Sequence, residues 1–233
     1  MRPVSFRTGF LRQAPGSVLV EQGGTRVLAA VSIDEQVPRW LRGKERGWLT
    51  AEYGMLPLSS GQRIRREREG LKGRSTEIQR LIGRSLRAAV DLRRLGERTV
   101  RVDCDVIEAD GGTRTASITG AFVALALALD RLDRRGAFAE PPLIRQIAAV
   151  SVGVVRGEPL LDLDYAEDSR AEVDLNVVQD AAGRFIEVQG TAEGAPFPRS
   201  ALDGLLDLAT AGNRELCRRQ REVLAGIALP EGG

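Results

Sequence analysis

With 233 residues, the chain is long enough to bury a real core, either as one large domain or as two small ones. Its net charge of only +2 excludes a uniformly polybasic nucleic-acid tail, although residues 63–98 carry a local +7 and residues 158–174 a local −6. The absence of histidine excludes Ser-His-Asp catalysis, Cys-His catalysis and histidine-ligated zinc sites.

The N-terminal part of the sequence predicts β structure. Residues 17–22 and 25–33 have strand character and flank Gly23-Gly24, which is a hairpin signal. Residues 47–56 predict a further strand that Pro57 ends. The sequence contains no Pro/Gly/Ser-rich linker, repeat or low-complexity tract, so we expect one continuous domain over residues 1–233.

The segment from Ser60 to Arg74 is the most basic loop of the sequence. Its arginines alternate with Glu67 and Glu69, and such a run usually forms a solvated charged surface. The density of arginines favours instead an arm that contacts phosphates.

Residues 75–95 predict a helix that begins immediately after Arg74. Thr76 and Gln79 are placed to form a capping box, and Gly96 would end the helix. The predicted helix therefore places an arginine at its N-terminus. Apolar residues at helical spacing predict a buried stripe of Ile78, Ile82, Leu86, Ala89 and Val90.

A strand, a glycine pair and a helix follow one another between residues 100 and 129. Val100, Val102, Cys104 and Val106 alternate with polar residues and predict the strand. After Gly111-Gly112, hydroxyl groups and Arg114 stand at the start of an apolar helix. This arrangement can hold an oxyanion, because glycines allow a close approach and free N–H groups point outward from the helix N-terminus. The alternative is a tight turn with Thr113 as the N-cap.

The cysteines and the apolar helix bear on where the protein works. Cys104 falls in a strand pattern and is predicted to be a buried thiol, which fits a reducing compartment. The apolar run 116–129 is too short to span a bilayer, and the sequence starts with strand-like PVSF rather than a signal peptide. We therefore expect a soluble, cytoplasmic protein with no membrane partner.

The second half of the sequence predicts strands over residues 147–155, 159–165 and 184–193, and a final helix over residues 198–224. Val177, Val178, Phe185, Ile186 and Val188 are expected to form a core face.

An acidic segment lies between these strands. Asp168, Glu172 and Asp174 could coordinate Mg²⁺ through oxygen ligands. One of the three carboxyls, kept protonated by its neighbours, could instead be a general acid. Acidic residues in a loop are otherwise solvated, but Asp174 precedes the apolar run LNVV and is expected to be half-buried.

Five segments in the same order resemble the ribonuclease PH family of bacterial phosphate-dependent exoribonucleases, and the resemblance runs from about residue 2 to residue 224. The segments are GWLTAEYGMLP, GRSTEIQRLIGRSLRAAVDLRRLGER, DCDVIEADGGTRTASITGA, AAVSVGVVRGEPLLDLDYAEDSRAEVDLNVV and EVQGTAEGAPF.

The resemblance implies site residues and a reaction. Phosphate, rather than water, attacks the terminal phosphodiester of RNA, and a nucleoside 5′-diphosphate leaves. Asp174 would protonate the leaving ribose 3′-oxygen or, together with Asp168, hold Mg²⁺. The family binds inorganic phosphate, the co-substrate, through positions that correspond here to Arg74, Gly112, Thr113 and Arg114, and its active-site aspartates correspond to Asp168 and Asp174.

The resemblance also implies a fold and partners. The fold is α/β (α+β), a βαβα unit like a domain of a ribosomal protein, duplicated within the chain and assembled into a homohexameric ring, a trimer of dimers. The implied activity is 3′-to-5′ trimming of tRNA precursors, with a role in rRNA processing left open. The RNA path would be lined by Arg63, Arg65, Arg66 and Arg68.

Two alternative functions differ in class from this one. A catalytically silent ring subunit that binds RNA would lack part of the site, whereas the site residues named above are all present. A nucleotide-binding protein on a dinucleotide fold would need GxGxxG or GxxxxGK[ST], and neither occurs.

The sequence departs from the family pattern in three places. It begins at RPVSF without the short basic segment of other members, and it stops soon after Leu229. Its basic loop is shorter and lacks the usual histidine and threonine. We expect these differences to affect RNA contacts and dimer packing rather than the phosphate site.

Overall fold

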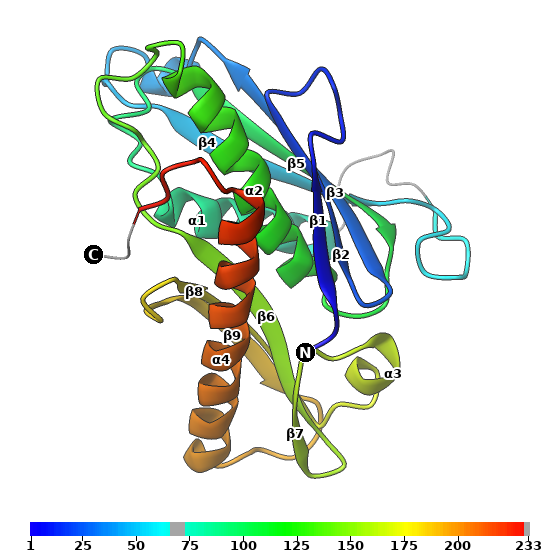
Figure 1. Cartoon of the computed structure of the whole chain (residues 1–233). Helices are drawn as coiled ribbons and strands as arrows, with labels where there is room; N and C mark the ends of the chain where they lie inside the picture. Colours follow the sequence, from blue (N-terminus) through cyan, green and yellow to red (C-terminus); the bar gives the residue numbers. More distant parts are fainter. Residues whose placement is uncertain (66–72, 231–233) are drawn as a thin grey trace.

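The structure, a computed structural model, describes residues 1–65 and 73–230. Within this part of the chain, nine strands form two sheets that pack with four α-helices, which confirms the mixed α/β fold. Figure 1 shows the two sheets one above the other, with α4 running beside the lower sheet toward α2. The elements are β1 (Val4–Thr8), β2 (Gly16–Gln22), β3 (Thr25–Asp34), a 3₁₀ turn (Arg39–Leu41), β4 (Trp48–Met55), α1 (Gly73–Ala88), β5 (Thr99–Glu108), α2 (Thr113–Asp133), β6 (Ile147–Val155), β7 (Glu158–Leu161), α3 (Tyr165–Asp168), β8 (Val173–Asp180), β9 (Phe185–Ala192) and α4 (Arg199–Val223).

The first sheet has the strand order β1-β2-β3-β5-β4. β2 and β3 form the predicted hairpin, in which Gln22 lies opposite Thr25 across the two glycines. β4 is parallel to β5, because α1 connects the two strands as a crossover. The chain therefore enters α2 directly from the end of a central strand of this sheet.

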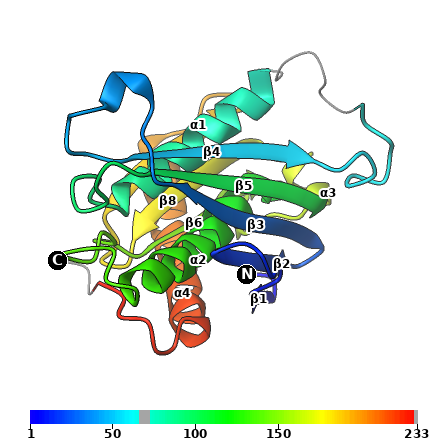
Figure 2. The same ribbon diagram turned by 90° about the horizontal axis from the view of Figure 1, so that it is seen from above.

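The second sheet is antiparallel throughout, with the order β7-β6-β8-β9. α4 packs against β6, β7 and β8, whereas α2 contacts β2 and β3 of the first sheet as well as β6 of the second. Seen from above in Figure 2, α2 lies between the strands of the two sheets. The N-terminus of α2 consequently lies where the two halves of the molecule meet.

α2 is longer than the predicted apolar run and has 21 residues. The apolar run 116–129 was expected to be too short to span a bilayer. The helix that contains it is long and apolar enough to do so by length and composition alone, so this expectation is wrong for the whole helix. However, 78% of its most apolar window is buried inside the protein, as in the core helix of a soluble protein. Packing between two sheets explains its apolar character on all sides.

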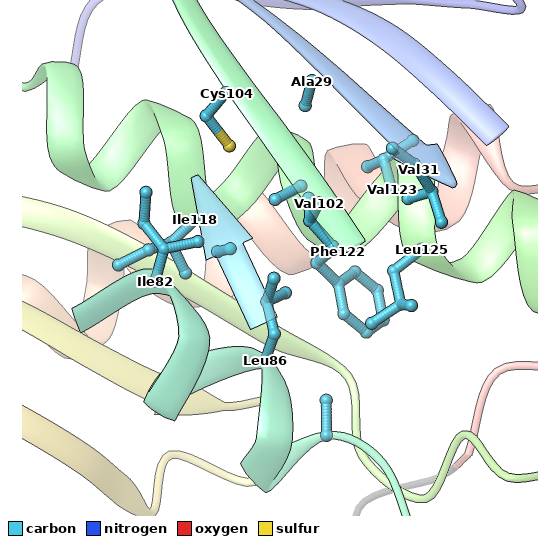
Figure 3. Close-up of a cluster of buried hydrophobic side chains, with 14 of the residues drawn as sticks. Ala29, Val31, Ile82, Leu86, Val102, Cys104, Ile118, Phe122, Val123 and Leu125 are labelled. Atoms are coloured by element: carbon cyan, nitrogen blue, oxygen red, sulfur yellow. The ribbon is translucent and has the colours of Figure 1, made fainter. Parts of the chain in front are cut away.

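The main core lies between the first sheet and the helices α1 and α2. Figure 3 shows Ile82 and Leu86 of α1, Val102 and Cys104 of β5, and side chains of α2 gathered in this core. The strand predicted from alternating residues is confirmed as β5, and all of its alternating apolar members are at most 1% exposed: Val100, Val102, Cys104 and Val106. Cys104 is a free thiol, and burial raises its pKa far above the ordinary value, which makes it unreactive at neutral pH.

Two predicted helix boundaries differ in the structure. α1 ends at Ala88 instead of continuing to residue 95, because Val90 forms a β-bridge with Leu143 and Asp91 caps the following turn. α1 also begins at Gly73, so Thr76 lies inside the helix and is not its N-cap. The predicted buried stripe is nevertheless confirmed.

The second sheet corrects two further expectations. The strand predicted over residues 159–165 ends at Leu161, because Asp162 adopts a left-handed backbone with φ of 63°. Phe185 and Val188 of β9 are 52% and 44% exposed and do not belong to the core. β9 is an edge strand, so fewer elements cover its faces.

Candidate active site

A cavity of about 1010 Å³ opens where the start of α2 faces the second sheet. The first half of the molecule contributes α1 and the turn between β5 and α2, and the second half contributes residues of β6, β8, β9 and the α3 region. The fold thus brings together six predicted site residues from distant parts of the sequence: Arg74, Gly112, Thr113, Arg114, Asp168 and Asp174 all line this cavity.

The glycine turn forms the first wall of the cavity. Gly111 and Gly112 both have left-handed backbones, with φ of 73° and 63°, and Gly112 is the N-cap of α2. Thr113 is the first helical residue, so its assignment as N-cap is wrong. Among the described residues no side chain caps this helix, which leaves its first N–H groups open to an anion.

Tyr53 on β4 orients the hydroxyl of Thr113. The two oxygens lie 2.9 Å apart, and Tyr53 is 4% exposed. Burial raises the pKa of Tyr53, so its phenol stays protonated at neutral pH. Tyr53 is not among the predicted site residues, although its alternation with Leu49 and Ala51, which are also buried, indicates an inward position.

Arg114 is held by a chain of hydrogen bonds that crosses three elements. Its Nη1 donates to Oε1 of Gln189 on β9 over 3.0 Å, and Nε2 of Gln189 donates to Glu77 of α1 over 2.8 Å. Glu77 also lies 3.6 Å from the Arg114 guanidinium, whose side chain is 21% exposed. The arginine is therefore oriented before any ligand binds, which favours tight recognition of phosphate.

Arg74 lies in the first turn of α1 rather than before the helix. Its exposed side chain lines the cavity, and its positive charge lowers the pKa of both Tyr53 and Asp174 against the stronger effect of burial. The helix start thus carries a second cation to the same cavity, as the sequence predicts.

Two aspartates face the cavity from the second half. Asp168 ends α3, and Asp174 lies on β8. Burial, and then the charge of Asp168, raise the pKa of Asp174 to about 6, although Arg114 opposes this effect. Within residues 1–65 and 73–230, buried Oδ1 of Asp174 has no hydrogen-bond partner. The half-buried position predicted for Asp174 is therefore confirmed.

Glu172 does not belong to this group, contrary to the expected acidic cluster. It is exposed, and its carboxylate accepts a hydrogen bond from the backbone N–H of Gly157 over 3.1 Å. Residues two apart in a strand point to the same face, but β8 begins at Val173, so Glu172 lies before the strand and does not line the cavity with Asp174.

A metal ion would have few protein ligands here. Among the described residues, no three Asp, Glu, His or Cys side chains form a group that could hold a metal. Mg²⁺ is commonly bound by one or two carboxylates together with substrate phosphates and water. The partnerless oxygen of Asp174, with Asp168 nearby, fits that kind of site.

Polar side chains on the second sheet form the floor of the cavity. Strand pairing places Ser151 of β6 opposite Asn176 of β8, and Asn176 opposite Gln189 of β9. Asp174 lies in the next row, opposite Thr191. These residues are not among the predicted site residues, because strand register decides which side chains become neighbours, and the sequence of a single strand does not reveal its register.

Half of the predicted RNA-binding arginines can be placed. Arg63 and Arg65 are exposed and flank Ile64, which lines the cavity. Arg66 and Arg68 lie outside the described residues.

Gly111 provides a stability test of how the turn is packed. A Cβ at this position would lie 2.3 Å from the carbonyl oxygen of Leu163, whereas a Cβ at Gly136, whose φ of 72° is nearly the same, would meet nothing within 4 Å. Both alanine variants lose about 1 kcal/mol to the left-handed backbone, and Gly111→Ala is expected to lose roughly 2 kcal/mol more through the clash.

Urea unfolding of Gly111→Ala and Gly136→Ala measures this difference. Equal losses of free energy of unfolding in the two variants would contradict the close packing of the glycine turn against residues 163–164.

Two family models match the chain. The model described as the 3′ exoribonuclease family, domain 1, matches residues 1–129, and the model described as domain 2 of the same family matches residues 145–218. The first match ends at residue 129, inside α2, and the second begins just before β6, so each match contains one of the two sheets.

Solved structures share the fold. Rrp46 of rice (Oryza sativa) has a TM-score of 0.78 and 21% identity, covering 96% of this chain and 95% of that one. A chain of the Archaeoglobus fulgidus exosome, determined with RNA bound to the active site, has a TM-score of 0.78 and 24% identity, covering 94% and 88%. A chain of an archaeal exosome core has a TM-score of 0.75 and 23% identity, covering 94% and 87%.

Proposed function

This chain belongs to the 3′ exoribonuclease family, and we propose from that premise that it is a phosphorolytic exoribonuclease. The observation that carries the proposal is the shared cavity: an uncapped helix N-terminus with Arg114 faces an aspartate whose pKa is raised to about 6. The first group suits an attacking phosphate, and the second suits the leaving oxygen.

In the proposed reaction the protein positions the phosphate and the RNA and stabilises charge, and it forms no covalent bond to either. The N–H groups after Gly112, the hydroxyl of Thr113 and the guanidinium groups of Arg74 and Arg114 hold inorganic phosphate. A phosphate oxygen forms a bond to the phosphorus of the last RNA linkage, and the bond from that phosphorus to the ribose 3′-oxygen breaks. The electron pair stays on the 3′-oxygen, and a nucleoside 5′-diphosphate is released.

Asp174 supplies the proton that the 3′-oxygen needs. With its pKa near 6, about one carboxyl in ten is protonated at pH 7, far more than for an aspartate with an ordinary pKa. Burial raises that pKa most, and the negative charge of Asp168 raises it further. The alternative role is that of a metal ligand: if Mg²⁺ binds, the ionised carboxylates of Asp168 and Asp174 would hold it, and the ion would neutralise charge on the phosphoryl oxygens.

Precursor tRNA is the proposed substrate, with other RNA 3′ ends, including those of rRNA, as further candidates. The support is the resemblance of five sequence segments to ribonuclease PH, together with the exposed Arg63 and Arg65 beside the cavity. The Archaeoglobus fulgidus exosome, which shares the fold, binds RNA at its active site. A homohexameric ring working in the cytoplasm is proposed on the same resemblance.

The alternative is a catalytically silent RNA-binding ring subunit. Similarity to exosome chains favours it, because these neighbours are components of larger assemblies. The phosphate-binding set and both aspartates line one cavity here, which supports the enzyme instead.

Incubation with a tRNA that carries a short 3′ tail tests the proposal. With inorganic phosphate present, we expect shortened tRNA and nucleoside 5′-diphosphates, and without phosphate no release. Nucleoside monophosphates formed without added phosphate would show hydrolysis and contradict the mechanism. RNA binding without any release under either condition would support the silent subunit.

A further inference from the structure

We propose that Arg2 and Asp162 are positioning residues that hold the Gly111-Gly112 turn in place for phosphate binding. The inference rests on the proposed function, which assigns phosphate to this turn. Arg2 and Asp162 are 160 positions apart in the sequence and do not line the cavity.

Arg2 makes contacts in two directions. Toward the second half of the molecule, its Nη2 donates to Oδ1 of Asp162 over 2.7 Å, and its backbone N–H donates to Oδ2 over 2.8 Å. Toward the glycine turn, its Nη1 donates to the backbone carbonyl oxygen of Asp110. One guanidinium group therefore connects Asp162 directly to the residue that precedes Gly111.

The carboxylate of Asp162 is completely buried and accepts hydrogen bonds from the first half of the chain, while its backbone N–H bonds to the second half. Its side chain is 0% exposed, and Nε2 of Gln22 on β2 also donates to Oδ1 over 2.7 Å. The backbone N–H of Asp162 donates to the carbonyl oxygen of Ser151 on the cavity floor over 2.7 Å. Moving this buried carboxylate would break its hydrogen bonds and leave a charge without partners, which is energetically costly. Asp162 is therefore held firmly in one position.

Leu163 and Asp164, which follow Asp162 in the second half, pack against the glycine turn. A Cβ at Gly111 would lie 2.3 Å from the carbonyl oxygen of Leu163 and 2.7 Å from the carbonyl carbon of Asp164. The backbone after Asp162 therefore packs directly against Gly111. Anchoring Asp162 fixes the position of this backbone and, with it, one side of the turn.

The guanidinium of Arg2 also lies close to Gly112. A Cβ at Gly112 would be 3.2 Å from Nη2 of Arg2, so the positive charge stands next to the residue that caps α2. On the first sheet, Thr25 completes the support, since its hydroxyl accepts from the N–H of Asp110 over 2.9 Å and donates to the carbonyl of Gly111 over 2.5 Å. Arg2 joins these supports to the second half, which carries Asp168 and Asp174. The backbone N–H of Tyr165 adds a longer contact between the two halves, because it donates to Oδ1 of Asp110 over 3.3 Å.

Two conservative variants weaken this connection with little change in volume. Arg2→Lys keeps the positive charge, but an ammonium group cannot reach Asp162 and the carbonyl of Asp110 as a planar fork does. Asp162→Asn keeps the shape and tolerates the left-handed backbone at φ of 63°, but it removes the charge that attracts Arg2. The matched control is Arg184→Lys, because Arg184 also contacts a nearly buried carboxylate, that of Asp180, over 2.7 Å, away from the cavity.

Amide hydrogen exchange of the intact protein tests the positioning directly. We expect the amides of residues 110–113 to exchange about ten-fold faster in Arg2→Lys and Asp162→Asn than in Arg184→Lys or the wild type. In steady-state kinetics, the same two variants should raise the KM for phosphate about ten-fold while the KM for RNA stays within about two-fold, because only the phosphate turn is displaced.

Exchange at residues 110–113 and a KM for phosphate that both match those of Arg184→Lys would overturn the proposal. Equal increases of the KM for phosphate and the KM for RNA would also overturn it, since they would indicate a general structural loss. A wild-type protein that shows no dependence on phosphate would contradict the proposed function instead. The exchange rates at the turn would still decide whether Arg2 and Asp162 hold it.

Discussion

Replacing Arg114 by alanine is expected to lower phosphate-dependent release of nucleoside diphosphates by about 1,000-fold, because a preoriented guanidinium stabilises charge on a transferring phosphoryl group. The chain of hydrogen bonds through Gln189 and Glu77 places the guanidinium in the cavity, so its removal deletes an interaction already formed in the free protein. Arg114→Lys should recover only part of the rate, since lysine cannot make a bidentate contact.

Two controls accompany the prediction for Arg114→Ala: the unfolding of the variant itself, and the activity of a variant at an arginine far from the cavity. Arg114 is partly exposed and lies at the start of α2, so Arg114→Ala should leave the circular dichroism spectrum and the cooperative unfolding transition intact. Arg218→Ala, on the exposed face of α4, removes an arginine that contacts only Glu215 and Glu222 in the described part of the chain. A rate for Arg114→Ala within ten-fold of that for Arg218→Ala would contradict the assignment.

Replacing Asp174 by asparagine is expected to lower the rate by 100-fold or more, in line with the roughly 10²–10⁴-fold contribution of general acids. The pH dependence identifies its role. If Asp174 protonates the 3′-oxygen, the kcat of the wild type falls as pH rises through about 6, and Asp174→Asn lacks this step. We expect this fall, because burial and Asp168 favour the protonated carboxyl.

An opposite pH profile would contradict the role of general acid. A kcat that rises with pH through about 6 and also requires Mg²⁺ would mean that the ionised carboxylate is the active form, as in a metal ligand. Phosphate itself titrates near neutrality, so the comparison is made between the wild type and Asp174→Asn at each pH.

Asp174→Asn is expected to lower the rate but to raise the stability of the folded protein. The folded protein raises the pKa of Asp174 from 3.8 to about 6, so the folded state binds more protons between these values. The free energy of unfolding therefore falls as pH rises through this range. Asp174→Asn removes that penalty and is expected to stabilise the protein at pH 7 by about 1–3 kcal/mol, since one pKa unit corresponds to about 1.4 kcal/mol and partial exposure reduces the effect.

Denaturant unfolding at pH 7 and pH 3 measures the effect of Asp174 on stability. At pH 3 the two proteins should have nearly equal free energies of unfolding, because Asp174 is protonated in both the folded and the unfolded state. A variant that is less stable than the wild type at pH 7 would show that Asp174 makes a favourable charged contact in the folded protein.

Local patterns in the sequence were sufficient for most elements of the fold. The alternation from Val100 to Val106 predicts β5, and Gly23-Gly24 predicts the hairpin of β2 and β3, because a strand repeats every two residues whatever surrounds it. The glycine pair before the apolar run also predicts a positive-φ turn that starts α2. The ends of the elements were harder to predict. α1 ends before Val90, because Val90 forms a β-bridge with Leu143, and the local sequence does not indicate a partner so distant in the chain.

The candidate site was determined by the sequence only in part. Residue type and neighbouring sequence identified Arg74, the GGTR turn and the aspartates, since oxyanion binding and proton transfer need particular groups at particular local positions. Only the tertiary structure brings Ser151, Asn176 and Gln189 into one row, and only it pairs Arg2 with Asp162. Such contacts depend on strand register and on how the two sheets meet around α2, which follow from packing of the whole chain rather than from the periodicity of any segment.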